Sequence, residues 1–171
     1  MNDRLKTIVD LENYPIHDLS SNKIQKLIKK CKDDLNQFSC STIPKFILPK
    51  SIKIMNSELE EKIDKVFMSK KSINPYLNSK DDLTLNKTHP KRTFLKRDNG
   101  YLNSDLFNKD SEMKFLYEQE ELLKFVSACL GISPIYRWAD PLACHAYNVM
   151  RPDGILPWHF DSCEFTLSIM I

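Results

Sequence analysis

The chain has 171 residues, of which 42% are hydrophobic and 28% are charged, and its formal net charge is +2. These values are typical of one globular domain and exclude an intrinsically disordered chain. The positive charge is small and spread over solvated helix faces, which argues against a nucleic-acid partner. No apolar stretch approaches the ~18 residues that a membrane-spanning helix needs, so no membrane partner is expected.

The cysteines and the first residues favour a cytoplasmic protein. The cysteines are odd in number, irregularly spaced and without a Cys-x-x-Cys pair, which argues against zinc; they are Cys31, Cys40, Cys129, Cys144 and Cys163. Reduced thiols in a reducing cytosol are the simpler interpretation. Residues 1–6 are charged, and no long apolar segment of the kind found in a signal peptide follows them.

The first two predicted helices lie in the Lys-rich N-terminal part. Ser20 or Ser21 can cap the first, whose apolar stripe consists of Ile24, Leu27, Ile28, Cys31 and Leu35. The second is expected to begin at residues 57–60, where Ser57 and Glu60 form a capping box. Its apolar face would then consist of Leu59, Ile63, Val66 and Phe67.

A third helix is predicted from about Ser111 to Leu130. Gly131 follows it as the residue after the cap, and Pro134 prevents continuation. Residues 118–121 are polar and interrupt the apolar stripe, so two shorter helices are an alternative.

Residues 74–100, between the second and third helices, are expected to be rich in loops. The pair Asn99–Gly100 predicts a tight turn, with a hairpin as one option, and residues 93–95 before it suit a short strand.

Beyond Gly131 the apolar pattern changes to a period of two. Residues 143–150, 156–161 and 165–171 each predict a strand, and residues 151–154 predict a turn. The short connections favour antiparallel pairing. Helices followed by consecutive short strands favour an α+β fold or a mainly β barrel decorated with helices.

The most chemical-looking pair of residues is His159 and Asp161. Two positions apart on a strand means the same face, while Trp158 and Phe160 point the other way. An imidazole and a carboxylate supply two of the three ligands of the 2-His-1-carboxylate site that holds Fe(II). A His-x-Asp pair alone is a weak signal, and a surface His beside a turn Asp is the alternative.

The sequence around this pair resembles the 2-oxoglutarate-dependent Fe(II) dioxygenases. The relevant stretches are residues 136–142, 147–149, 151–152, 158–161 and 164–165, and the segments "NPYLNSKDD", "HPKRTFLKRDNGYL" and "LYEQEELLKFVSACLG". Within that superfamily the chain is most similar to the bacterial group of amino-acid hydroxylases and free-amino-acid halogenases. The resemblance covers about residues 70–171.

This resemblance implies a partial double-stranded β-helix, or jelly roll, with the N-terminal helices packed outside. Residues 1–110 would be its helical and loop-rich part, and residues 111–171 a helix followed by the first jelly-roll strands. It implies Fe(II), 2-oxoglutarate and O2 as cofactor and cosubstrates, with His159 and Asp161 as iron ligands. Asn148 matches a position near 2-oxoglutarate, although a strand Asn bonded to a neighbouring backbone is an equal alternative.

The retained carboxylate of Asp161 favours hydroxylation of a small molecule such as a free or carrier-bound amino acid. Family halogenases have Gly or Ala at that position, which opens a site for chloride. Arg92 and Glu164 are candidate substrate contacts, as is Arg97, although solvated loop arginines are the commoner case.

The family's distal iron-binding His and its 2-oxoglutarate-binding Arg lie further along the chain than Ile171. His17, His89 and His145 are expected to be structural or exposed rather than a third ligand. We therefore expect residues 1–171 to be a single incomplete oxygenase domain that binds iron weakly and is inactive. The alternatives are a non-catalytic jelly-roll binding or scaffold protein that keeps a vestigial His-x-Asp pair, and a cupin-like metal-binding protein.

Overall fold

The computed structural model describes residues 3–171, which form two compact units. The first unit contains residues up to Glu61, then Ser104–His145 and Ile171. The second contains Lys62–Asn103 and Ala146–Met170, and it carries both His159 and Asp161. The single incomplete oxygenase domain expected over residues 1–171 stays a prediction.

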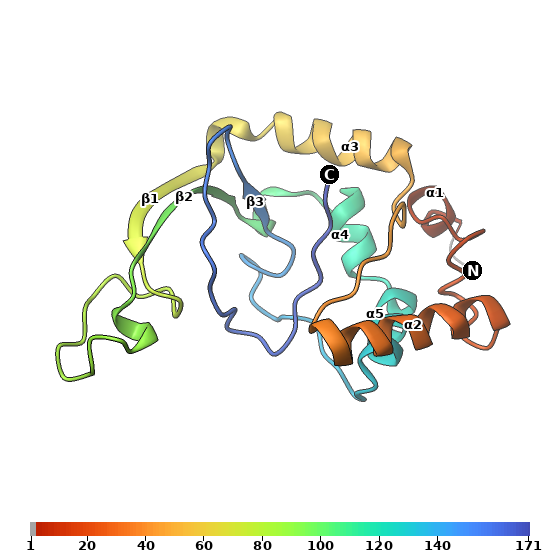
Figure 1. Cartoon of the computed structure of the whole chain (residues 1–171). Coiled ribbons are helices and arrows are strands. Elements are labelled where there is room, and N and C mark those ends of the chain that lie inside the picture. Colours follow the sequence, from red (N-terminus) through yellow and green to blue (C-terminus); the bar gives the residue numbers. More distant parts are fainter. Residues whose placement is uncertain (1–2) are drawn as a thin grey trace. The chain divides into compact units, whose positions relative to one another are not determined.

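The first unit is helical, with α1 (Leu5–Ile8), α2 (Asn22–Phe38), α3 (Pro49–Glu60), the short η3 (Ser104–Leu106), α4 (Glu112–Tyr117) and α5 (Glu120–Leu130). α2 packs against α5, while α1, α3 and α4 contact one another (Figure 1). The predicted first helix is confirmed, because α2 begins just after Ser21 and buries the predicted residues Ile24, Ile28 and Cys31.

The predicted third helix is two helices, which was the alternative that the sequence left open. α4 ends at Tyr117, and Gln119 has an extended backbone before α5 begins at Glu120. Gly131 adopts the left-handed conformation with φ of 71° and ends α5, as its position predicted.

The predicted start of the second helix is wrong. α3 begins at Pro49 and ends at Glu60, so Ser57 and Glu60 lie in its last turn and do not cap its start. Proline suits the first position of a helix because its missing N–H has no helical partner there. The residues expected to continue the helix instead form η1 (Ile63–Lys65) and the start of β1.

The second unit is built on a three-stranded antiparallel sheet in the order β1 (Phe67–Ile73), β2 (Leu95–Leu102), β3 (Tyr147–Val149). Phe67 pairs with Tyr101, and Tyr101 pairs with Asn148. The connection between β1 and β2 contains η2 (Pro90–Arg92). The mixed class of helices and antiparallel strands was predicted and is confirmed, whereas the jelly roll stays a prediction.

The predicted turn at Asn99–Gly100 is wrong, because both residues lie inside the central strand β2 and are buried. Asn99 pairs with Ser69, and Gly100 pairs with Met68 on one side and Val149 on the other. A Cβ at Gly100 would lie against the Met68 side chain and 3.2 Å from the Val149 carbonyl oxygen. Glycine here serves close packing and not a reversal of the chain.

The strands predicted after Gly131 are mostly wrong. Within residues 143–150 only Tyr147–Val149 is a strand, and residues 156–161 and 165–171 have no regular structure. The turn at 151–154 is confirmed, since the Gly154 N–H donates to the Arg151 carbonyl oxygen at 2.8 Å. An alternating apolar pattern forms a strand only where the edge of another strand is available for pairing. Among the described residues, the segment after Ile155 has no such edge to pair with.

Candidate metal site

The segment that carries His159 and Asp161 is extended and is anchored at two points of the second unit. Ile155 exchanges two backbone hydrogen bonds with Asp98 of β2, at 2.7 and 2.8 Å. The Phe160 N–H donates to the Pro75 carbonyl oxygen at 2.8 Å. Pro157 between these anchors has no N–H to donate to a ladder, which helps explain why the segment is held without becoming a strand.

Along this extended backbone, aromatic side chains contact one another and polar side chains contact one another. The rings of Trp158 and Phe160 meet edge to face, with centroids 4.6 Å apart, and Phe160 also contacts Tyr76. His159 and Asp161 meet each other, with 3.2 Å between Nε2 and Oδ1. The structure therefore brings the two predicted ligands together, although not on the strand that the sequence predicted. His159 is the better shielded, with its side chain 20% exposed against 46% for Asp161.

The contact of His159 with a backbone carbonyl indicates which ring nitrogen carries the hydrogen and which has the lone pair. Nδ1 lies 2.7 Å from the Pro157 carbonyl oxygen. A carbonyl oxygen only accepts, so Nδ1 carries the hydrogen, and in neutral imidazole Nε2 then has a lone pair. That lone pair is directed at Oδ1, which is also an acceptor. The contact is favourable only if a proton or a cation lies between the two atoms.

A divalent metal ion fits this geometry. Two ligand atoms about 2.1 Å from one ion and at right angles to each other lie about 3 Å apart, close to the observed 3.2 Å. A backbone carbonyl that holds the other ring nitrogen is the usual partner of a metal-binding histidine. An imidazolium–carboxylate ion pair fits the same distance.

Thr166 orients the carboxylate of Asp161. Its hydroxyl donates to Oδ2 at 2.6 Å, which leaves Oδ1 for Nε2 of His159. The Cys163 sulfur lies 3.4 Å from the same hydroxyl. Sequence reasoning missed Thr166, because a hydroxyl five positions after a carboxylate on irregular backbone gives no periodic signal.

Replacing Thr166 by valine should therefore lower the affinity for Mn(II) roughly tenfold, since loss of a group that orients a ligand typically costs 10- to 100-fold and this site is partly exposed. Isothermal titration with Mn(II) measures the change. Thr166→Ser keeps the hydroxyl and should bind as the wild type does. Equal affinity in Thr166→Val and the wild type would remove Thr166 from the site.

Asn148 takes part in a polar row on one face of the same sheet. Arg97 Nε donates to Asn99 Oδ1 at 2.6 Å, and Asn99 Nδ2 donates to Asn148 Oδ1 at 3.3 Å. In this row Asn148 uses its Oδ1 to accept the hydrogen bond from Asn99. Its Nδ2 group, on an exposed residue, is a donor. The Nη groups of Arg97 are also donors only, so the row presents positive character that suits an anion.

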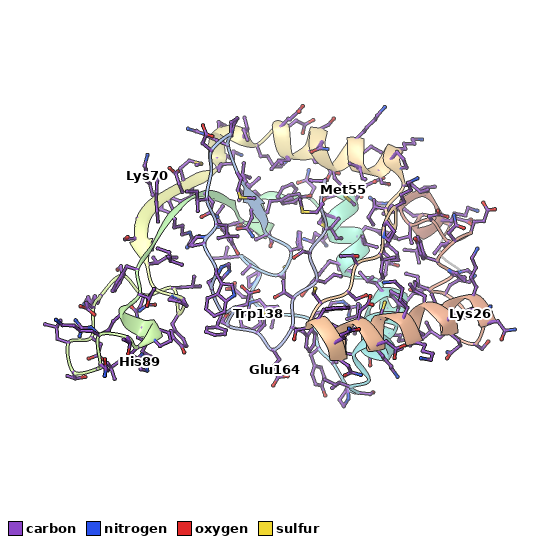
Figure 2. All side chains as sticks on the ribbon, viewed as in Figure 1. Lys26, Met55, Lys70, His89, Trp138 and Glu164 are labelled. Carbon is purple, nitrogen blue, oxygen red and sulfur yellow. The ribbon has the colours of Figure 1, made fainter. Side chains whose placement is uncertain are left out.

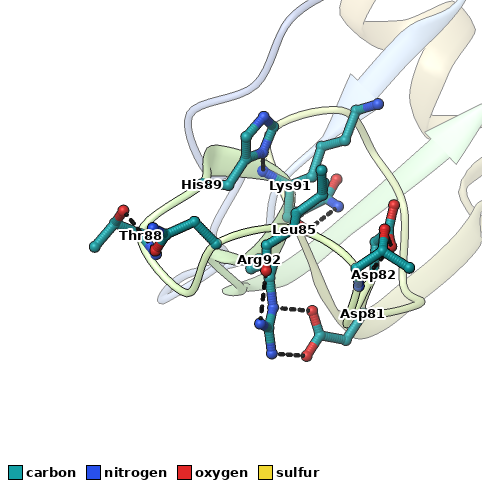
Figure 3. Close-up of polar contacts among 10 residues, drawn as sticks. Asp81, Asp82, Leu85, Thr88, His89, Lys91 and Arg92 are labelled. Carbon is teal, nitrogen blue, oxygen red and sulfur yellow. Dashed lines mark hydrogen bonds and ion pairs between the residues drawn. The ribbon is translucent and has the colours of Figure 1, made fainter.

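Arg92 and Glu164, the predicted substrate contacts, are placed differently. Arg92 forms a two-pronged ion pair with Asp81, at 2.9 Å through both Nε and Nη2, and donates through Nη1 to the Leu85 carbonyl oxygen (Figure 3). The guanidinium group of Arg92 therefore binds residues of its own loop. Glu164 lies at an exposed bend, with its side chain directed away from the chain (Figure 2). Their contact with substrate stays a prediction.

The histidines considered as a third ligand have local contacts of their own. His89 Nδ1 accepts from the Lys91 N–H at 3.1 Å (Figure 3). His145 lies beside Tyr117 and 3.1 Å from the Cys144 sulfur, and its burial lowers its pKa. Within residues 3–171, no cluster of three or more His, Cys, Asp or Glu side chains is arranged to hold a metal ion.

Comparisons with protein-family models, with curated proteins and with solved structures find no match to this chain. Among the helices of residues 3–171, none has the length and apolar character required to cross a membrane.

Proposed function

We propose that the chain is part of a cytoplasmic Fe(II)- and 2-oxoglutarate-dependent oxygenase that hydroxylates a small molecule such as an amino acid. The observation that carries the proposal is the pair of facing acceptors, Nε2 of His159 and Oδ1 of Asp161, 3.2 Å apart. The sheet of the second unit would then belong to a double-stranded β-helix. The resemblance over about residues 70–171 supports the reaction class.

In this proposal each residue of the site has a defined task. His159 and Asp161 bind the ion, and the Pro157 carbonyl and Thr166 hydroxyl hold their ring and carboxylate in the binding orientation. Bound Fe(II) supplies the site at which 2-oxoglutarate and O2 react. Asn148, which accepts from Asn99, would donate through Nδ2 to a carboxylate of 2-oxoglutarate, and Arg97 would add positive charge to the same row.

Titration with Mn(II), a stand-in for Fe(II) that does not oxidise in air, tests the metal site. Because only two ligands come together within residues 3–171, we expect a dissociation constant above about 1 μM, and 2-oxoglutarate should tighten binding by adding its own oxygen ligands. Absence of Mn(II) binding with and without 2-oxoglutarate would contradict the proposal. Sub-micromolar affinity would contradict the expected weakness.

The substitution Asn148→Asp should weaken the binding of 2-oxoglutarate, in the presence of Mn(II), by about tenfold or more. A carboxylate at position 148 can still accept from Asn99, so the sheet should be retained, but it replaces the outward donor with a negative oxygen. Isothermal titration with 2-oxoglutarate measures the effect. Arg92→Met serves as the control and should bind normally, because Arg92 is engaged by Asp81.

A non-catalytic binding or scaffold protein is the second candidate, and one observation favours it. The side chain of Asp161 is 46% exposed, and an ion pair with protonated His159 accounts for the same 3.2 Å contact without a metal. Succinate release by the full-length protein, tested across a panel of amino acids, separates the two functions. Succinate release that depends on the presence of one amino acid supports the oxygenase. If no amino acid of the panel leads to succinate release, the binding protein is favoured.

A further inference from the structure

A solvent-open cavity of about 560 Å³ lies where α2 meets α5 in the first unit. Its walls are formed mainly by the two helices and by residues 131–135, which follow α5. Small-molecule sites in proteins have volumes of roughly 300–1,000 Å³, so this cavity is large enough to hold a ligand. The pair His159 and Asp161 belongs to the second unit, and the cavity takes no part in the site proposed above.

Most of the side chains that line the cavity are aliphatic. Ile28 of α2 and Ile135 after α5 are 5% and 9% exposed, so they form the well-buried part of the lining. Leu123 and Ala128 add further apolar surface from α5. Ile132 is 50% exposed at the same cavity. An alkyl chain bound here would remove apolar surface from water on both the ligand and the protein.

The backbone of Ile132 is fixed to the last turn of α5. The Ser127 hydroxyl donates to the Ile132 carbonyl oxygen at 2.5 Å, and the Ile132 N–H donates to the Ser127 carbonyl oxygen at 3.3 Å. Gly131 between them turns the chain in the left-handed conformation, with φ of 71°. Two hydrogen bonds therefore hold this half-exposed isoleucine at the cavity.

The charged residues that line the cavity are both cations, Lys32 of α2 and Lys124 of α5. No Asp or Glu of residues 3–171 lines it. Elsewhere on α2 a lysine is paired with an acid, as Lys29 is with Asp33 at 2.7 Å. Lys32 and Lys124 have no such ion-pair partner in the part of the chain that the structure describes. This uncompensated positive charge beside aliphatic walls is complementary to an anionic group on an apolar ligand.

We propose that this cavity binds an unbranched alkyl carboxylate, the chemical class of the fatty acids. The alkyl chain would lie against Ile28, Ile132 and Ile135, and the lysine ammonium groups would donate to the carboxylate. An alkyl carboxylate is the simplest molecule that combines an apolar body with one anionic end. A neutral alkyl alcohol lacks the charge, and an alkyl ammonium ion has the wrong sign.

Titration of the ¹⁵N-labelled full chain with hexanoate, octanoate and decanoate, each below its micelle-forming concentration, tests the proposal by NMR. We expect a dissociation constant for decanoate on the order of 1 mM or tighter. Each pair of added methylene groups should tighten binding roughly 4- to 15-fold, the lower value applying if the open cavity buries only half of the chain. The amide shifts should be concentrated in residues 25–32 and 123–135, which surround the cavity.

The lysines provide matched variants. The double variant Lys32→Met, Lys124→Met keeps the apolar stems and should weaken decanoate binding about fivefold or more, because the charged donors are lost. Lys26→Met, a change at an α2 lysine outside the cavity, should bind as the wild type does. All three positions are exposed, so the variants should fold. Decan-1-ol should bind the wild type more weakly than decanoate does. Equal affinity for acid and alcohol, no dependence on chain length, or shifts concentrated outside the cavity would overturn the proposal.

Discussion

The substitution His159→Ala is expected to lower the Mn(II) affinity at least about 100-fold. Structural zinc sites with four ligands bind with roughly 10–16 kcal/mol, which is about 3 kcal/mol for each ligand and so on the order of 100-fold in affinity. His159 is one of the two ligand candidates that come together in residues 3–171, so its loss leaves Asp161 alone. Mn(II) electron paramagnetic resonance, which reports the free ion, measures the change.

Two further variants show whether such a loss is specific. Asp161→Asn should lower the Mn(II) affinity by a similar factor. Because the Asn amide can donate to Nε2 of His159, the pair becomes satisfied without a cation, and the fold should be kept. His89→Ala removes a histidine that accepts from the Lys91 N–H, and it should bind Mn(II) as the wild type does. Wild-type affinity in His159→Ala would place the metal elsewhere.

The substitution Leu102→Ala is expected to reduce the free energy of unfolding by about 2–5 kcal/mol. Leu102 is 0% exposed at the end of β2 and pairs with Tyr147 of β3, so truncation leaves a cavity beside the central strand. For a chain of this size the loss corresponds to a fall in Tm of roughly 5–15 °C. Differential scanning calorimetry and urea denaturation measure it.

Leu95→Ala is the matched control, since it is the same change at the other end of β2. Leu95 is 37% exposed and pairs with Ile73. Its truncation should cost less than about 1 kcal/mol, because much of the side chain already contacts water. Equal losses at the two positions would mean that the buried and exposed ends of the strand are wrongly assigned.

The helices could be predicted where the sequence carried both an apolar stripe and a stop signal. α2 has the stripe Ile24, Ile28 and Cys31, and α5 ends at Gly131 in the left-handed conformation. α3 could not be placed in this way, because the pattern at Ser57 and Glu60 imitates a capping box inside a helix that Pro49 has already started. A local signal of that kind has no means of excluding a helix begun upstream.

The strands were harder to predict, because a strand exists only with its partners. Asn99–Gly100 has the sequence of a tight turn, yet pairing with β1 and β3 places it in the central strand. Residues 165–171 have the composition of a strand, yet within the described chain they have no edge to pair with. Tertiary pairing therefore overrides local preference in both directions.

In the candidate site, too, the features set by local sequence could be predicted and those set by tertiary structure could not. The convergence of His159 and Asp161 could be predicted, because positions two apart share a side of any extended backbone, even one that is not a strand. Thr166 and the row from Arg97 through Asn99 to Asn148 could not, because they depend on a loop conformation and on the register of β2 with β3.

Diffraction from crystals soaked in Mn(II), with data that record the anomalous signal of manganese, tests the central claim most directly. We predict one anomalous peak about 2.1 Å from both Nε2 of His159 and Oδ1 of Asp161, with Nδ1 still bonded to the Pro157 carbonyl. A peak elsewhere, or none while Nε2 and Oδ1 remain in direct contact, would show that a proton and not a metal ion joins the pair.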